Sequence, residues 1–204
     1  MGAADAISTR ISESRGEPPR HANQLAIRSY QRGRHERDAI RSFRRELARQ
    51  RLGPDAPVEW HIADLAEPLA FLPDGSIDVV VAPLVLHYLR DWTVPLSEFH
   101  RVLVGGGSLV ASVHHPFLDY VTSGSENYFA LESYSETWNK RGASATMTFW
   151  RRPLQMVISS VLQAGFRLDA LSEPMPLPEV EQLYPIDWKA LTTRPWFLFL
   201  RATK

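Results

Sequence analysis

The amino-acid sequence predicts an α/β sandwich built on a largely parallel β-sheet. Two apolar runs, "IDVVVAP" at 77–83 and "SLVASVHH" at 108–115, are typical of strands, and a helix-like segment lies between them. A second helix-like segment, at 153–164, is followed by more strand-like sequence. This alternation of strand and helix favours parallel strands joined by helices that cover the sheet.

The two central strands are apolar at nearly every position instead of alternating. Such runs indicate strands that are buried on both faces. Pro116 closes the second of them. An earlier β-rich segment does alternate, and it ends at Asp64. The predicted strands are 58–64, 77–83, 108–115, 166–174 and 195–203.

Two helices are predicted in the first half of the chain from apolar spacing and from the residues at their ends. The first covers 36–52 and stops at Gly53. The second has Thr93 as its candidate N-cap, Pro95 in its first turn and Gly105 as its stop signal.

The best helix signal comes later in the chain. Pro153 stands at its start, apolar residues follow at positions i, i+3, i+4, i+7 and i+8, and Gly165 ends it. Residues 117–150, which precede it, are rich in aromatic side chains and are predicted to be irregular.

Composition limits the classes of protein that the sequence can represent. A chain of 204 residues suits one domain with a sizeable core. The absence of cysteine excludes disulfides, thiolate metal sites and cysteine nucleophiles. No apolar run approaches the roughly 18–20 residues of a membrane span, and no signal peptide is apparent, so we expect a cytoplasmic protein.

The net charge of zero hides an asymmetry between the two ends of the chain. Residues 1–51 carry twelve Arg, no Lys and six acidic residues, a net charge of +6, and the remainder carries −6. Residues 1–45 are therefore predicted to be an Arg-rich segment that is disordered or not native to the fold. Residues 46–204 form the predicted domain.

From residue 46 onward the sequence resembles the class I S-adenosylmethionine-dependent methyltransferases. The resemblance is carried by "LPDGSIDVVVAPLVLHYLRDWTVPLSEFHRVLVGGGSLVASVHHP" and by "RRPLQMVISSVLQAGF" with the closing "RPWFLFLRATK". It implies a Rossmann-like sheet in the strand order 3-2-1-4-5-7-6, S-adenosylmethionine as cofactor, and a small-molecule acceptor beneath an aromatic lid at 117–150.

The resemblance also assigns residues to the cofactor, which in such sheets lies at the carboxyl ends of the strands. Asp64 would accept the adenine amino group, with Leu65 beside it; a turn cap is the alternative role for Asp64. The end of the strand at 77–83 would pass the methionine part. The predicted cofactor-binding residues are Asp64, Leu65, Ala82, Pro83, Leu84 and His87. His87 is interpreted as a partly buried shelf residue rather than a catalyst.

The predicted acceptor pocket lies at the end of the next strand. His114 and His115 are the candidate bases, because neutral imidazole titrates near physiological pH; a capped strand end is the alternative. Tyr128 and Trp138 are candidate pocket residues or ordinary core aromatics. No carboxylate near the two histidines completes a metal site, so no metal is predicted. Arg151 and Arg152 are structural residues or an anion-binding pair.

One departure from the family pattern bears on activity. The glycine loop after strand 1, and the acidic residue that would follow about 20 residues later, have no counterpart in residues 1–51, whose only glycines are at 2, 16 and 33. The sheet is therefore expected to be truncated, with strands 1 and 2 missing or replaced, and cofactor binding to be weak or absent. A shifted reading frame would explain this departure, and resequencing of the locus tests that hypothesis.

The lost strands have a structural consequence. Without them the strand at 77–83 exposes an apolar edge unless the N-terminal segment covers it. Two alternatives to an active methyltransferase follow. The chain is a catalytically inactive remnant, or its Arg-rich arm binds nucleic acid through phosphate contacts.

Overall fold

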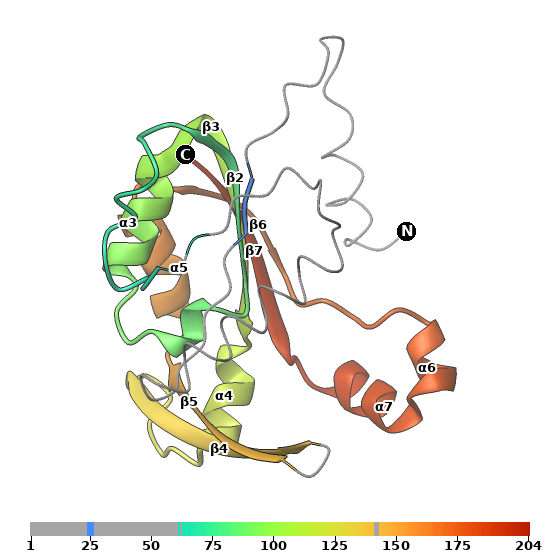
Figure 1. Ribbon diagram of the computed structural model, residues 1–204. Helices are drawn as coiled ribbons and strands as arrows, with labels where there is room; N and C mark the ends of the chain where they lie inside the picture. The colour runs from blue at the N-terminus through green and yellow to red at the C-terminus, as the bar shows by residue number, and fades with distance from the viewer. Residues whose placement is uncertain (1–23, 27–60, 62, 141–142) are drawn as a thin grey trace.

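The computed structural model describes residues 24–26, 61, 63–140 and 143–204 (Figure 1). Its main sheet has five strands in the order β1-β2-β3-β7-β6. The strands are β1 (Gln24–Ala26), β2 (Ile77–Pro83), β3 (Leu103–His114), β7 (Phe197–Thr203) and β6 (Arg167–Ser172). β1, β2 and β3 are parallel to one another, and β7 is antiparallel to both of its neighbours. The predicted α/β class with a largely parallel sheet is confirmed.

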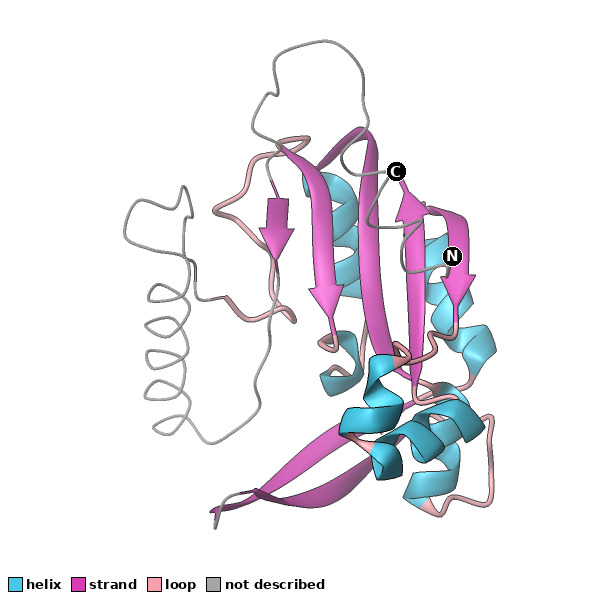
Figure 2. Cartoon of the chain, turned by 90° about the vertical axis from the view of Figure 1, so that its right-hand side faces the viewer, coloured by secondary structure: helices cyan, strands magenta, loops and turns pink. Residues whose placement is uncertain are grey.

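The edge of β2 is covered by β1. Gln24 pairs with Val79, and the register continues to Ala26 and Val81 (Figure 2). The N-terminal segment thus supplies a strand beside β2, which was one of the two outcomes expected from the loss of strands 1 and 2. Residues 24–26 are the only described part of the segment 1–45, so its predicted disorder or non-native origin stays a prediction.

The predicted strand ending at Asp64 is not present at the residues that the structure describes there. His61, Ala63 and Asp64 have no strand pairing. A turn forms instead, in which the Asp64 carbonyl accepts the amide of Glu67 at 3.1 Å. The predicted helix at 36–52 lies outside the described part of the chain.

The turn from Pro73 to Ser76 leads into β2. The next α-helix after β2 is α3 (Thr93–Val102). Thr93 is the first helical residue and not the N-cap: its amide donates to Oδ1 of Asp91 at 2.8 Å. The helix also ends before Gly105, because its last carbonyls have other donors. The carbonyl of Arg101 accepts the amide of Gly75 at 3.0 Å and Lys204 Nζ at 3.3 Å, and the carbonyl of Val102 accepts the amide of Ser76 at 2.8 Å.

The helix predicted at 153–164 is α5 (Leu154–Gln163), with Pro153 at its N-cap. Gly165 ends it at φ +93°, a backbone conformation that glycine adopts without strain. α3 and α5 lie on one side of the sheet (Figure 1), and their buried side chains join it in one core. The helix residues of this core are Leu96, Phe99, Val102, Val157 and Val161.

The described residues of the segment predicted to be irregular form a helix and two strands. Residues 117–150 contribute to α4 (Pro116–Ser123) and to a separate two-stranded antiparallel sheet of β4 (Glu132–Lys140) and β5 (Ala143–Arg151). Figure 2 shows α4 and this hairpin beyond the carboxyl ends of β2 and β3. Hydroxyl side chains bond across the hairpin, Ser135 with Thr148 at 2.9 Å and Thr137 with Thr146 at 3.3 Å.

Two short helices, α6 (Glu179–Leu183) and α7 (Pro185–Thr193), connect β6 to β7. They pack against each other and contain no buried side chain of their own. Figure 1 shows them projecting away from the helices that cover the sheet. No helix in the described ranges is both long and apolar enough to cross a membrane.

Candidate functional site

The backbone turns sharply where β2 ends. Ala82 is buried, whereas Pro83 and Leu84 are exposed. Leu84 has φ +49°, which is uncommon for a residue with a side chain. Its amide donates to the carbonyl of Ser112 at 2.9 Å and to the Ser112 hydroxyl at 3.2 Å. The neighbouring strand β3 therefore holds Leu84 in a conformation that turns the chain away from the sheet.

The two residues predicted at the adenine position have different environments. Asp64 is exposed, and its Oδ1 accepts the amide of Ala66 at 3.0 Å, which is the turn-capping role weighed from the sequence. Leu65 is buried in the main core. Only the Asp64 carboxylate is thus presented to solvent.

His87 is a buried residue of the 3₁₀ turn η1 (Leu86–Tyr88). Its ring stacks on that of His114, with centroids 4.0 Å apart, and its Nδ1 accepts the amide of His114 at 3.3 Å. Burial, together with the charges of His114 and Arg152, lowers the pKa of His87 to about 2. His87 is therefore neutral at physiological pH, and its imidazolium form is not available as a proton donor.

His114 has a carboxylate partner that spacing in the sequence does not reveal. Its Nδ1 lies 3.3 Å from Oδ1 of Asp119, a buried residue of α4. The same oxygen accepts the hydroxyl of Tyr134, on β4, at 2.5 Å. Desolvation and the Asp119 charge raise the pKa of Tyr134 far above its usual value, so this phenol stays protonated. We call His114, Asp119 and Tyr134 the His114 cluster.

An aromatic wall covers the His114 cluster. The ring of Phe149 lies 4.8 Å from that of His114 and 5.5 Å from that of Tyr134. Trp138, predicted to line the pocket, lies 5.9 Å from Phe149, is 39% exposed and donates from Nε1 to Glu136 at 2.9 Å. The strand–helix–hairpin arrangement thus places one histidine among aromatic side chains at the end of β3.

His115 follows the last residue of β3 as the N-cap of α4 and has a structural role. Its Nδ1 accepts the amide of Phe117 at 3.1 Å, which caps α4, and its Nε2 lies 2.8 Å from Oε1 of Glu173. The two adjacent histidines therefore do not lie together, and the capped strand end weighed from the sequence is what the structure shows for His115.

Tyr128 also bonds to a helix end. Its hydroxyl accepts the amide of Leu154 at 3.0 Å, at the first turn of α5. The neighbouring Arg151 is fully buried and donates to the carbonyls of Tyr128 and Asn127, to the Ser125 hydroxyl, and to the Glu132 carboxylate at 2.5 Å. Arg151 is therefore structural: it holds the chain between α4 and β4 against β5.

Asp119, Tyr134 and Phe149 were not identified from the sequence as site residues. The alternation of Tyr134, Glu136 and Trp138 along one strand, and of Met147 and Phe149 along its partner, is the signal that would have predicted the hairpin. Nothing in the spacing of Asp119 distinguishes it from a surface acid.

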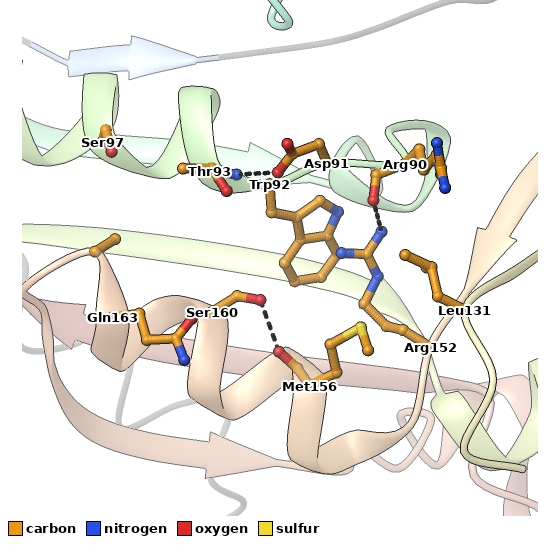
Figure 3. Close-up of a pocket in the computed structure, with 11 residues that line it drawn as sticks. Arg90, Asp91, Trp92, Thr93, Ser97, Leu131, Arg152, Met156, Ser160 and Gln163 are labelled. Carbon is orange, nitrogen blue, oxygen red and sulfur yellow. Dashed lines mark hydrogen bonds between the residues drawn. The ribbon is translucent and has the colours of Figure 1, made fainter.

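A pocket of about 380 Å³ has none of the ten predicted site residues in its wall. Figure 3 shows it between the segment that enters α3 and the side of α5, with Arg152 reaching toward Trp92. Within the described ranges, no group of three or more His, Asp or Glu side chains is placed to hold a metal ion.

Comparison with known proteins agrees with this architecture. Residues 38–111 match the methyltransferase domain family. A curated protein of Haemophilus influenzae, itself uncharacterised, is 27% identical over 149 residues, which are 68% of this chain and 58% of that protein. The chain thus spans less than two thirds of that relative.

Solved structures share the fold. A protein of Listeria monocytogenes assigned to the S-adenosylmethionine-dependent methyltransferases matches with a TM-score of 0.63 and 21% identity, over 77% of this chain and 73% of that one. An S-adenosylmethionine-dependent methyltransferase of Mesorhizobium loti matches with a TM-score of 0.59 and 22% identity, over 78% of this chain and 76% of that one. A Pyrococcus horikoshii protein matches 99% of this chain and 76% of its own, with a TM-score of 0.55 and 10% identity. The chain therefore contains a segment that matches the methyltransferase domain family, and it has the fold of these S-adenosylmethionine-dependent methyltransferases.

Proposed function

We propose that the chain transfers a methyl group from S-adenosylmethionine to a small-molecule acceptor at the carboxyl ends of β2 and β3. The observation that carries this proposal is the His114 cluster. Pro83, at the end of β2, pairs with Ser112, and β3 continues two residues further to His114. A histidine paired with a carboxylate thus lies just beyond the exposed turn where this family places its cofactor.

The described residues fit the methionine and adenine parts of the cofactor better than the part that a glycine loop would hold. Pro83 and Leu84 present an exposed strand end to the methionine part, and Asp64 presents an exposed carboxylate for the adenine amino group. The segment that follows β1 in the sequence, "IRSYQRGR", contains only Gly33 and lacks the closely spaced glycines of a nucleotide loop. We therefore expect the cofactor to bind weakly.

S-adenosylmethionine, when bound, supplies an electrophilic methyl group on a sulfonium. The role that we assign to the chain is to hold the acceptor and take its proton. The Asp119 carboxylate favours the tautomer of His114 with the proton on Nδ1, which leaves Nε2 as a base. Nε2 of His114 would accept the proton that the acceptor oxygen or nitrogen gives up when it is methylated. Phe149 and the hairpin restrict access of water.

Calorimetry with S-adenosylmethionine and S-adenosylhomocysteine tests the cofactor part. We expect dissociation constants above the micromolar range, further weakened by Asp64→Ala. Micromolar affinity would contradict the weak cofactor binding that we propose. If neither compound binds at millimolar concentration, the methyltransferase proposal fails for this chain.

Transfer itself is tested with a labelled methyl donor and panels of phenols, amines and carboxylic acids. The parent should form methylated product with at least one panel, and His114→Gln should lose most of that activity while retaining cofactor binding. Cofactor binding without transfer to any acceptor would favour the alternative of an inactive remnant. Equal turnover in the parent and His114→Gln would remove His114 from the mechanism.

A further inference from the structure

Arg152 is a buried cation without an ion-pair partner among the described residues. Its exposed fraction is 5%. Nη2 donates to the carbonyls of Leu89 at 2.7 Å and Arg90 at 3.2 Å, and the guanidinium lies 3.9 Å from the centre of the Trp92 ring. Nε is buried and has no hydrogen-bond partner. Two carbonyls and an aromatic face stabilise the guanidinium without neutralising its charge.

Other arginines of the same fold show how such a charge is usually balanced. Arg151, one residue earlier, pairs with Glu132 at 2.5 Å. Arg101, which is partly exposed, pairs with Asp74 at 2.5 Å and Glu98 at 2.8 Å. Removing a charge from water carries a desolvation penalty that a carboxylate at contact distance offsets. Arg152 carries that penalty without such a contact.

The pKa of Arg152 reflects this imbalance. Burial lowers it to about 10, and the charges of Asp91 and Asp119 oppose the shift without reversing it. Neither acid lies within ion-pair distance of the guanidinium. Asp91 is exposed and its Oδ1 is engaged by the amide of Thr93. At physiological pH Arg152 is still protonated, so the charge remains.

Space for a compensating group lies beside this cation. Arg152 is part of the wall of the 380 Å³ pocket, and Figure 3 shows its side chain crossing the pocket toward Trp92. The volume falls within the range of small-ligand sites, which begins near 300 Å³. Polar and apolar side chains share the rest of the wall, including Arg90, Ser97, Met156, Ser160 and Gln163.

We propose that this pocket binds a small organic anion, with a carboxylate or phosphate group seated against Arg152. A guanidinium held in a fixed plane is suited to both groups. Arg90 supplies a second positive charge at the exposed rim, and Ser160 and Gln163 supply hydrogen-bonding groups from α5. The exposed Asp91 disfavours anions at one part of the rim, which restricts the charged group to the Arg152 end.

This site is distinct from the proposed methyl-transfer site. None of the predicted cofactor or acceptor residues contributes to the pocket wall. Arg152 nevertheless also borders a cavity of about 10 Å³ that His87, His114 and Asp119 help to enclose. An anion at Arg152 therefore sits one side chain away from the His114 cluster, and the proposal stands whether or not the chain transfers methyl groups.

The test uses the full chain and defined probes at constant ionic strength. Calorimetry and thermal melting are measured with inorganic phosphate, acetate, malonate and citrate, against chloride as reference. We expect at least one probe to raise the melting temperature by several degrees at millimolar concentration. A response confined to phosphate identifies a phosphoryl ligand, and a response confined to the organic acids identifies a carboxylate. If all four probes act like chloride, the proposal is wrong.

Variants then locate the effect. Arg152→Met keeps the length of the side chain and removes the charge, so it should abolish the response with only a small change in the melting temperature in chloride. Ser160→Phe fills the pocket and leaves Arg152 in place; it should also abolish the response and serves if Arg152→Met does not fold. Arg167→Gln, at an exposed arginine, should respond like the parent. Probe binding that survives both pocket variants would overturn the assignment.

Discussion

Oδ1 of Asp119 lies 3.3 Å from Nδ1 of His114 and accepts the hydroxyl of Tyr134 at 2.5 Å. The three residues come from β3, α4 and β4, so the sheet, the helix that follows it and the hairpin meet at one carboxylate. Because the Asp119 carboxylate is buried, its hydrogen-bonding neighbours His114 and Tyr134 stabilise its charge and fix its orientation. The His114 cluster therefore links the position of the hairpin to the tautomer of the His114 imidazole.

Replacing the central carboxylate should change the tautomer of His114. In Asp119→Ala we expect the share of His114 protonated on Nδ1 to fall, because no acceptor remains beside that nitrogen. Nitrogen-15 shifts of the imidazole measure this share directly. Methyl transfer, where an acceptor has been found, should fall about 10- to 100-fold. Tyr134→Phe, which keeps the carboxylate, is the matched control, and a tautomer shift as large as in Asp119→Ala would contradict the assignment.

Acidification should destabilise the fold through His87. Burial holds the pKa of His87 near 2, below the unfolded value of 6.5, so the unfolded state binds more protons between these two values. The stability that the neutral ring contributes is present above pH 6.5 and is lost as the pH falls. This group alone should cost about 1 kcal/mol between pH 6.5 and 5.5. Urea denaturation at several pH values measures it, and His87→Asn should flatten the profile; an unchanged slope would refute the cause.

The buried guanidinium of Arg151 should contribute strongly to stability. Arg151→Met removes donors from two carbonyls, a hydroxyl and the Glu132 carboxylate, and we expect a loss of about 3 kcal/mol. Hydrogen exchange should rise first in residues 125–132, which those bonds hold. Arg152→Met, the adjacent substitution, is the control and should lose little stability. Similar losses in the two variants would contradict the different roles inferred for them.

A side chain at Gly165 should destabilise the fold, for two separable reasons. Its φ is +93°, and a Cβ would lie 3.1 Å from Nε2 of His100. Gly165→Ala is expected to cost about 1–2 kcal/mol in urea denaturation. Adding His100→Ala should recover the steric part and leave the conformational part. If the double variant shows simple additivity, the contact with His100 does not contribute.

The central part of the sheet was predictable because its signals are local. β2 coincides with the predicted 77–83, since an apolar run between a turn and Pro83 leaves little choice of boundaries. α5 follows its apolar spacing between Pro153 and Gly165 for the same reason. The end of α3 was misplaced because its stop depends on Lys204 and on the turn before β2, which are distant in sequence.

The candidate site was less accessible to sequence reasoning. His114 was identified from its place at a strand end, but its partner Asp119 depends on how α4 leaves β3 and on where the hairpin lies. The strand expected at 58–64 does not extend to Asp64, because a hydrogen bond to the Asp64 side chain favours a turn there. The roles assigned to Asp64, Pro83, Leu84 and His87 toward the cofactor stay predictions.

The excursion through α6 and α7 leaves the sheet after Ser172 and returns at Phe197, and the two strands that flank it are immediate neighbours in the ladder. Its length can therefore vary without altering the register of any other strand. A chain of this kind can acquire, shorten or exchange that appendage while its core is preserved. Diversification among descendants of such a scaffold should concentrate there, as grafting experiments between homologues would show.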